Sequence, residues 1–156
     1  MAGTSQTSLF GQVTEGDLDT AYRIHVKGPL FLTQELLPLI ADGGRIVNIS
    51  SGLTRFAYPG RIAYASMKGA VEVMTHYMAK ELGGRGIAVN TVAPGAIQTD
   101  FSGGAVRDNP DIARHIAQTT APGRPGLPDD IGPMLCSLLS EDNPRINAQP
   151  IALYGG

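Results

Sequence analysis

The sequence lacks most features that would suit secretion, a membrane or nucleic acid. Its 156 residues include one cysteine, Cys136, so no disulfide can form within the chain, and a reducing cytoplasm is the expected compartment. No apolar run approaches about 18 residues, and no basic segment precedes an apolar one at the start, which argues against a membrane span or a signal peptide. A net charge of -2 without a basic stripe argues against nucleic acid as a partner.

The composition is typical of a globular protein. Apolar residues make up 42% of the chain and charged residues 17%. The length fits one domain, residues 1–156, which should bury roughly two-thirds of the surface that the unfolded chain exposes. Cys136 lies in the apolar stretch MLCSLL, which predicts a thiol in the core. We expect no metal site.

Apolar spacing divides the chain into alternating helices and strands. Long helices are predicted at residues 14–40, 61–82 and 127–142, with a short one at 110–118. Short apolar or β-branched runs predict strands at residues 44–50, 86–95 and 148–156. Helical crossovers of this length join parallel strands, so the sequence predicts an α/β fold with a parallel sheet flanked by helices.

The first predicted helix carries two local signals. Thr14 suits an N-cap, and Asp17 stands three residues later in the position of a capping box. Gly28 and Pro29 lie inside the helix, where a proline removes a hydrogen bond, so we expect a bend there.

Tyr64 and Lys68 lie four residues apart in the segment AYASMKGAVEVM, which places them on one face of the second long helix. A free tyrosine has a pKa of about 10, and a cation a few ångströms away lowers it by favouring the phenolate. Tyr64 could then exchange a proton with a substrate oxygen at neutral pH. The alternative is a surface tyrosine beside a solvated lysine, because such a pair arises by chance with a probability of roughly 0.1.

Ser51 directly follows the strand predicted at residues 44–50, at the end of the strand where α/β folds place ligand chemistry. Its hydroxyl could donate to the same substrate oxygen as Tyr64, and two donors on one oxygen polarise a carbonyl or stabilise an alkoxide. The alternative is a turn in which the serine bonds to the backbone. A serine hydrolase is poorly supported, because Ser51 lacks a Gly-x-Ser-x-Gly context and an evident histidine partner.

These residues belong to a larger pattern. The segments GRIVNISS, AYASMKGAV and IAVNTVAPGAIQTDF occur in an order that resembles the short-chain dehydrogenase/reductase family, and the closing AQPIALYGG is similar to that family's last strand. The resemblance covers nearly the whole chain, from Ala2 to Gly156. It implies a partial Rossmann-like, doubly wound fold whose first strands are missing.

The resemblance implies NAD(P)-dependent hydride transfer between a nicotinamide and a small carbonyl or alcohol. Tyr64 would be the general acid/base. Lys68 would lower its pKa and hold the nicotinamide ribose, and Ser51 would orient the substrate carbonyl. The family's segment that lies against the nicotinamide matches this chain at Pro94, Gly95, Ile97 and Thr99. The irregular residues 101–126 correspond to the family's mobile substrate lid.

His25 departs from the family pattern. The family usually has an asparagine at this place in the long helix, and that asparagine bends the helix and holds a water in a proton relay to the lysine. A histidine can also bond a carbonyl or a water, but it is bulkier and titrates at about pH 6.5. His25 is therefore either a catalytic relay residue or a plain substitution at a tolerant site.

A second departure concerns the cofactor. The stretch at residues 1–3 is similar to the tail of the family's Asn-Asn-Ala-Gly motif, so we expect the Gly-rich dinucleotide fingerprint to be missing. The glycines at residues 83–86 are no substitute, because they end a helix and open a strand. The choice between NAD and NADP stays open. The outer edge of strand 44–50 would be unpaired, which predicts low stability or a compensating oligomer.

Two functions remain open at this point. The chain is either an NAD(P)-dependent oxidoreductase of this family, or a truncated, catalytically inactive fragment that acts by pairing with a full-length relative. The first predicts loss of activity in Tyr64→Phe with the fold intact, and the missing fingerprint favours the second. In the family the two long helices commonly form a dimer interface, so a homo-oligomer is expected.

Overall fold

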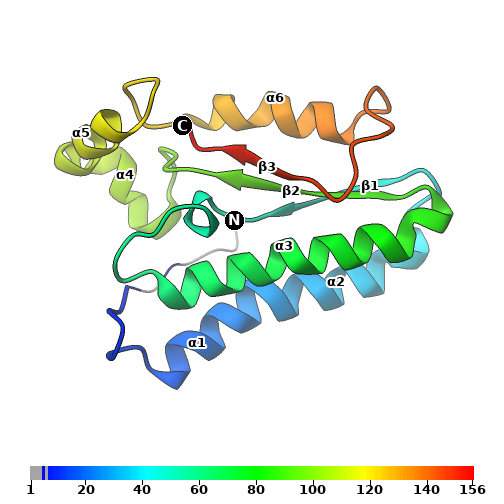
Figure 1. Ribbon diagram of the computed structural model, residues 1–156, viewed down its shortest axis with the longest axis horizontal. Helices are drawn as coiled ribbons and strands as arrows, with labels where there is room; N and C mark the ends of the chain where they lie inside the picture. The colour runs from blue at the N-terminus through cyan, green and yellow to red at the C-terminus, as the bar shows by residue number, and fades with distance from the viewer. Residues whose placement is uncertain (1–4, 6) are drawn as a thin grey trace.

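The computed structural model describes residue 5 and residues 7–156, and it has three layers (Figure 1). The middle layer is a parallel sheet with strand order β1-β2-β3, formed by Arg45–Ile49, Ala88–Pro94 and Pro150–Leu153. The long helix α3, Ile62–Leu82, covers one face together with the N-terminal helices, and α6, Pro128–Leu139, covers the other. The predicted alternation of helices and parallel strands is confirmed.

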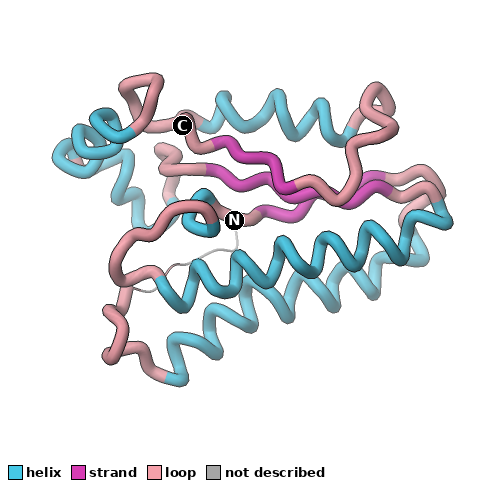
Figure 2. The backbone as a smooth tube through the Cα atoms, viewed as in Figure 1, coloured by secondary structure: helices cyan, strands magenta, loops and turns pink. Residues whose placement is uncertain are grey.

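The central strand β2 is buried along almost its whole length, whereas β1 lies at an edge of the sheet. Arg45 pairs with Ala88 at one end of the β1–β2 ladder and Ile49 with Val92 at the other. Within residues 5 and 7–156, no strand pairs with the outer edge of β1. Figure 2 shows the strands side by side, with their carboxyl ends on the side where the short helices lie.

The N-terminal helix is continuous but changes its hydrogen-bond pattern. It runs as α1, Glu15–Tyr22, a π-helical segment, Arg23–Lys27, and α2, Gly28–Leu36, and it ends in a 3-10 turn, Leu37–Leu39. Pro29 lacks an N–H, and its ring would press on the carbonyl of the residue four positions earlier. The N–H of Gly28 bonds to the carbonyl of Arg23, five residues back. The expected irregularity therefore takes the form of a π turn directly before the proline.

The predicted N-cap of this helix is confirmed. The Asp17 backbone N–H donates to Thr14 Oγ1 at 3.1 Å, and the Thr14 N–H donates to Asp17 Oδ2 at 3.1 Å. This reciprocal capping box satisfies two backbone donors at the start of α1 and lowers the pKa of the Asp17 carboxyl.

The remaining helices are short. Two of them, α4 at Ala105–Asp108 and α5 at Pro110–Thr119, lie beyond the carboxyl ends of the strands (Figure 1). The predicted helix at 110–118 is confirmed as α5, which begins at Asn109, whose side chain accepts from the N–H groups of Asp111 and Ile112. One-turn 3-10 segments lie at Gly52–Thr54, Gly83–Arg85 and Phe101–Gly104.

A buried hydroxyl aligns α3 on the sheet. Thr75 Oγ1 donates to the carbonyl of Val71 at 2.8 Å, accepts from Asn48 Nδ2 at 2.9 Å and lies 2.8 Å from the Thr91 hydroxyl. Asn48 and Thr91 are paired across β1 and β2. Because a buried polar group needs its partners, this hub holds α3 in one position along both strands.

The prediction of a core thiol is wrong: Cys136 is exposed. Helix α6 buries Leu138, two residues later, and residues two apart on a helix point to nearly opposite sides. The apolar stretch MLCSLL therefore supplies one buried face only. No helix in the described residues is both long enough and apolar enough to cross a membrane.

Candidate active site

The carboxyl end of β1 and the first half of α3 bring three of the predicted site residues together. Ser51 stands two residues after β1 and is buried. Tyr64 and Lys68 lie one turn apart on the buried face of α3, with only 7% and 8% of their surfaces exposed. A surface tyrosine beside a solvated lysine, the alternative reading of this pair, is therefore wrong.

Tyr64 is enclosed by side chains from three segments. The ring of His25 meets it edge-on at a centroid distance of 5.1 Å, and the ring of Phe101 lies 6.0 Å away. Lys68 Nζ lies 5.5 Å from the centroid of the same ring. The helix spacing explains the lysine, whereas the two aromatic neighbours come from distant parts of the chain.

Burial raises the pKa of the Tyr64 phenol, while a hydrogen bond from Ser51 and the positive charge of Arg61 act to lower it. The sequence predicted a lowering caused by Lys68. In the folded chain the loss of water around the phenol outweighs the opposing effects, because removing water destabilises the phenolate. Tyr64 is consequently protonated at neutral pH.

Burial also lowers the pKa of Lys68, to about 8. Its ammonium donates to the carbonyl oxygen of Ile49 at 2.8 Å. The N–H of Ser50 bonds to Val92 on the central strand, and successive residues of a strand present their backbone groups to opposite sides, so the Ile49 carbonyl faces the outer edge of β1. Lys68 thus satisfies a backbone acceptor that no strand reaches within the described residues.

His25 is placed by the π turn of the N-terminal helix, and only 3% of its surface is exposed. It lines a cavity of about 250 Å³ together with Lys68 and Ile49, next to the outer edge of β1. The sequence had suggested a relay between the histidine and the lysine, and the two side chains do border one space. Its role as a relay residue remains a prediction.

The segment after β2 turns the chain toward Tyr64. Gly95 packs so tightly against the end of β3 that a Cβ there would lie 2.7 Å from Tyr154 Cβ, and its N–H donates to the carbonyl of Leu153 at 3.0 Å.

The other predicted cofactor-binding residues follow in the same segment. Thr99 Oγ1 accepts from the N–H of Phe101 at 3.2 Å. Pro94 is the last residue of β2, and Ile97 forms a single parallel bridge with Gly126. Within this segment it is Phe101 whose ring meets Tyr64.

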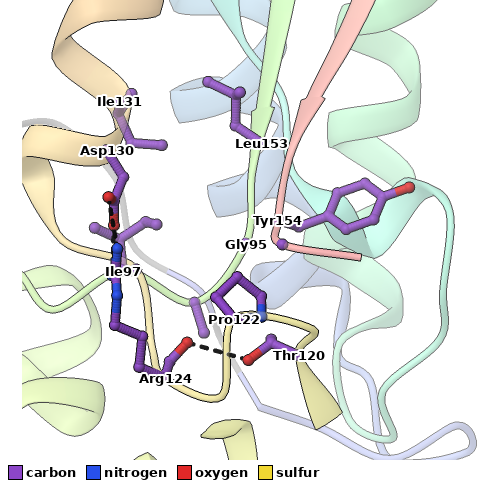
Figure 3. Close-up of a pocket in the computed structure, with 12 residues that line it drawn as sticks. Gly95, Ile97, Thr120, Pro122, Arg124, Asp130, Ile131, Leu153 and Tyr154 are labelled. Atoms are coloured by element: carbon purple, nitrogen blue, oxygen red, sulfur yellow. Dashed lines mark hydrogen bonds and ion pairs between the residues drawn. The ribbon is translucent and has the colours of Figure 1, made fainter.

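A second hollow, of about 230 Å³, lies between this segment and α6. Figure 3 shows Ile97, Pro122 and Leu153 around it and the Tyr154 ring turned away from it. Arg124 closes one side by donating to both carboxylate oxygens of Asp130, at 2.7 and 2.8 Å. This bidentate pair lowers the pKa of the Asp130 carboxyl.

Three consecutive residues at the start of the predicted lid have left-handed backbone conformations. They are Ser102, Gly103 and Gly104, with φ angles of 53°, 70° and 78°. Glycine adopts this region without a steric penalty, whereas serine does so rarely. Residues 101–126 also hold α5, the short helix that the sequence predicted, and α4, which it did not predict.

Three neighbours of this site were missed from the sequence. Phe101 touches Tyr64, Arg61 lowers its pKa, and Glu72 holds the loop that carries Ser51. A carboxylate four residues after Lys68 on an otherwise apolar helix face was a usable signal for Glu72. Nothing in the local sequence marks Phe101 or Arg61, because their relation to Tyr64 depends on how distant segments fold.

The residues present fit one end of a dinucleotide. Ser51, Tyr64 and Lys68 meet beyond the carboxyl end of β1, as expected for the nicotinamide side of an α/β cofactor site. The glycines at 83–86 form a 3-10 turn between α3 and β2, so they end a helix and do not open one. Within residues 5 and 7–156, no Gly-rich turn leads from a strand into a helix to cradle a pyrophosphate.

Comparison with known proteins identifies the architecture. The family model described as Enoyl-(Acyl carrier protein) reductase matches residues 1–156. A 3-oxoacyl-[acyl-carrier-protein] reductase, FabG, from Thermotoga maritima is 35% identical over 158 residues, covering 99% of this chain and 63% of that protein.

Solved structures agree with this match. LugOII, a promiscuous reductase that catalyses keto-reduction at C1 during lugdunomycin biosynthesis, superposes with a TM-score of 0.90 at 41% identity, over 96% of this chain and 58% of its own. The angucycline C-6 ketoreductase LanV with bound NADP gives a TM-score of 0.92 at 35% identity, over 100% of this chain and 60% of its own.

The chain therefore spans about three-fifths of the length of the relatives that it matches. Its three parallel strands and flanking helices correspond to part of their Rossmann fold. With the family model matched over the whole chain, the protein belongs to the short-chain dehydrogenase/reductase family.

Proposed function

We propose that this chain supplies the catalytic half of an NAD(P)-dependent carbonyl reductase. The observation that supports it best is the enclosed phenol of Tyr64, with Ser51, Lys68 and His25 around it at the carboxyl end of β1. When bound, the nicotinamide supplies a hydride to the carbonyl carbon. The residues of the chain bind the carbonyl and donate a proton to its oxygen.

Tyr64 donates its phenolic proton to the oxygen of the substrate carbonyl as that oxygen becomes an alkoxide, and Ser51 donates a second hydrogen bond to the same oxygen. Two donors aimed at the developing charge stabilise the transition state. Because burial raises the pKa of Tyr64, the phenol is held in its protonated form at neutral pH. The protonated phenol is the form that a general acid needs for the reduction of a ketone.

Lys68 restores the proton. Its amine is largely charged at neutral pH, because its pKa is about 8. Lys68 also lines the cavity that His25 lines. A proton can pass from solvent through this cavity to the region of Tyr64. In this proposal His25 takes the relay position that the family gives to an asparagine.

The nicotinamide end of the cofactor is assigned to Pro94, Gly95, Ile97 and Thr99, together with Tyr64 and Lys68. Thr99 Oγ1 accepts from a backbone N–H, so its own proton is available to an outside acceptor. The presence of NADP in the LanV structure supports NADP over NAD.

The substrate is proposed to be a small-molecule ketone. FabG, LugOII and LanV are all named for reduction of an oxo or keto group, which favours this class over an ester. The ring of Phe101 beside Tyr64 offers an apolar wall for a flat substrate. We propose the lid, residues 101–126, as the part that selects it.

A homo-oligomer is also proposed. Large apolar side chains are exposed on the layer formed by α2 and α3, among them Phe31, Leu32, Val73 and Tyr77. Such a patch marks an interface more often than a solvated surface. The organisation as one domain, residues 1–156, and a cytoplasmic location remain predictions from the sequence.

The non-enzymatic alternative is pairing with a full-length relative. It is favoured by the outer edge of β1, which no strand covers in the described part of the chain, and by the cavity beside it. An unpaired edge is a template for another strand. In that case the purified chain would bind no cofactor until the relative is added.

The first experiment is a fluorescence titration of the chain with NADPH and, separately, NADH, which suits a protein without tryptophan. Saturable binding of either, followed by oxidation of the cofactor with a ketone panel, supports the reductase. Tyr64→Phe should lower the turnover by about 10²–10⁴-fold, the usual contribution of a general acid. The matched control is Tyr22→Phe, an exposed tyrosine on α1 outside the apolar patch of α2 and α3, which should leave turnover unchanged. No binding up to millimolar cofactor by the folded chain would sink the proposal.

A further inference from the structure

Glu72 is a buried carboxylate one turn beyond Lys68 on α3, and 8% of its surface is exposed. Its Oε1 accepts from the hydroxyls of Ser50 and Thr54, at 2.9 and 2.7 Å. Its Oε2 lies 2.9 Å from Nη2 of Arg55. A buried carboxylate is unfavourable unless charge and hydrogen bonds compensate it, and here both oxygens are engaged.

All three partners of Glu72 come from the short segment after β1. This segment, residues 50–55, also contains Ser51 and the 3-10 turn Gly52–Thr54. The Ser50 hydroxyl lies 3.2 Å from the carbonyl of Lys68 as well, and the Thr54 hydroxyl lies 2.9 Å from the carbonyl of Ser51. We call this set, Ser50, Thr54 and Arg55 around Glu72, the loop clasp.

The turn that the loop clasp anchors also holds the Ser51 hydroxyl. The N–H of Leu53 donates to Ser51 Oγ at 3.2 Å, so this hydrogen bond to the hydroxyl oxygen orients the Ser51 side chain. Its proton is then available for Tyr64 or for a substrate oxygen. Since Tyr64 and Glu72 sit on the same helix, anchoring the loop to Glu72 sets the distance between Ser51 and Tyr64.

We propose that Glu72 is a positioning residue for the catalytic pair: the loop clasp holds residues 50–55 against α3, so that the Ser51 hydroxyl meets the oxygen of Tyr64. This inference rests on the proposed function for its meaning in catalysis. The structural part, that Glu72 places Ser51 against Tyr64, is independent of whether the chain turns over a substrate.

The variant Glu72→Met tests the clasp, because methionine keeps the length and apolar stem of the side chain and removes both acceptor oxygens. The full chain is labelled with 3-fluorotyrosine, whose fluorine brings phenol ionisation to a lower pH, and the five tyrosines are followed by fluorine NMR during a pH titration. Tyr64→Phe assigns the Tyr64 signal. Circular dichroism checks that each variant is folded.

A positioning role and a purely electrostatic role of Glu72 predict shifts of opposite sign in the titration midpoint of Tyr64. Loss of the carboxylate charge alone would lower the titration midpoint of Tyr64, because the phenolate would be repelled less. Loss of the Ser51 hydrogen bond would raise it by about 0.7 pH unit, the shift that corresponds to one ordinary hydrogen bond. We expect Glu72→Met to raise the midpoint as much as Ser51→Ala does, and the double variant to raise it no further.

Two variants serve as controls and a third as a second test. Glu72→Gln retains an acceptor oxygen for Ser50 and Thr54, and Glu81→Gln removes an exposed carboxylate from the same helix, so neither should raise the midpoint. If Glu72→Met does not fold, Thr54→Val removes one hydroxyl donor from the clasp while Glu72, Ser50 and Arg55 stay, and it should raise the midpoint in the same direction by a smaller amount. An unchanged or lowered midpoint in the folded variant, or an increase additive to that of Ser51→Ala, overturns the proposal.

Turnover gives a separate reading. In a chain that reduces a ketone, Glu72→Met should lower kcat by the same factor as Ser51→Ala and leave the KM for NADPH unchanged, whereas Glu72→Gln should retain most of kcat. If the wild-type chain has no activity, the proposed function fails, and the NMR titration still decides whether Glu72 places Ser51.

Discussion

Lys68 offers a quantitative test of the buried site, through the substitution Lys68→Met. Burial lowers the pKa of its ammonium from 10.5 to about 8, and its surface is only 8% exposed. One pKa unit corresponds to about 1.4 kcal/mol, so holding the charge in this site at neutral pH is unfavourable by about 3 kcal/mol. Methionine keeps the apolar stem and removes the charge.

The pH dependence gives the cleaner measurement, because at any one pH the variant also loses the hydrogen bond to Ile49. Between pH 8 and pH 10.5 the unfolded chain keeps a proton on Lys68 that the folded chain has released. The unfolded state binds more protons, so the free energy of unfolding of the wild type rises with pH in this window. Integrated from pH 7 to pH 10, the gain over Lys68→Met is about 2.5 kcal/mol.

Urea denaturation of both proteins at pH 7 and at pH 10 measures this difference. Lys80→Met is the matched control, since Lys80 is exposed on the same helix and its removal should leave the pH dependence as in the wild type. A wild type that does not gain stability relative to Lys68→Met on going to pH 10 would refute the reasoning, because it would mean that the ammonium is solvated in the folded chain.

Three further changes have expected outcomes. Gly95→Ala should lower the free energy of unfolding by about 1–3 kcal/mol in a thermal melt, because the new Cβ would lie 2.7 Å from the Cβ of Tyr154 and 2.8 Å from its Cα. Thr75→Val leaves the buried amide of Asn48 without its hydroxyl acceptor, and urea unfolding should show a loss of about 1–3 kcal/mol. Arg124→Gln breaks an exposed bidentate pair, so limited proteolysis should cut residues 120–127 faster while the midpoint of global unfolding stays the same.

Much of the fold was predictable because local chemistry determines it. The capping box at Thr14, the three strands and the long helices follow from residue type and apolar period, and all were found. The spacing of Tyr64 and Lys68 by four residues placed both on one helix face, as the geometry of any α-helix requires. The segments GRIVNISS, AYASMKGAV and IAVNTVAPGAIQTDF, in that order along the chain, were sufficient to recognise the family, which the comparisons confirm.

The tertiary structure decided which environment these residues enter. Burial depends on atoms contributed by distant segments, so the raised pKa of Tyr64 and the exposed position of Cys136 could not be derived from neighbours in the sequence. His25 lies in the π turn before Pro29, and its ring meets Tyr64 from a helix that is distant in the sequence. The clasp at Glu72 likewise joins side chains up to 22 residues apart. The sequence by itself determined which chemical groups are present and their spacing on each element, whereas the folded contacts decided their solvation, their protonation and their partners.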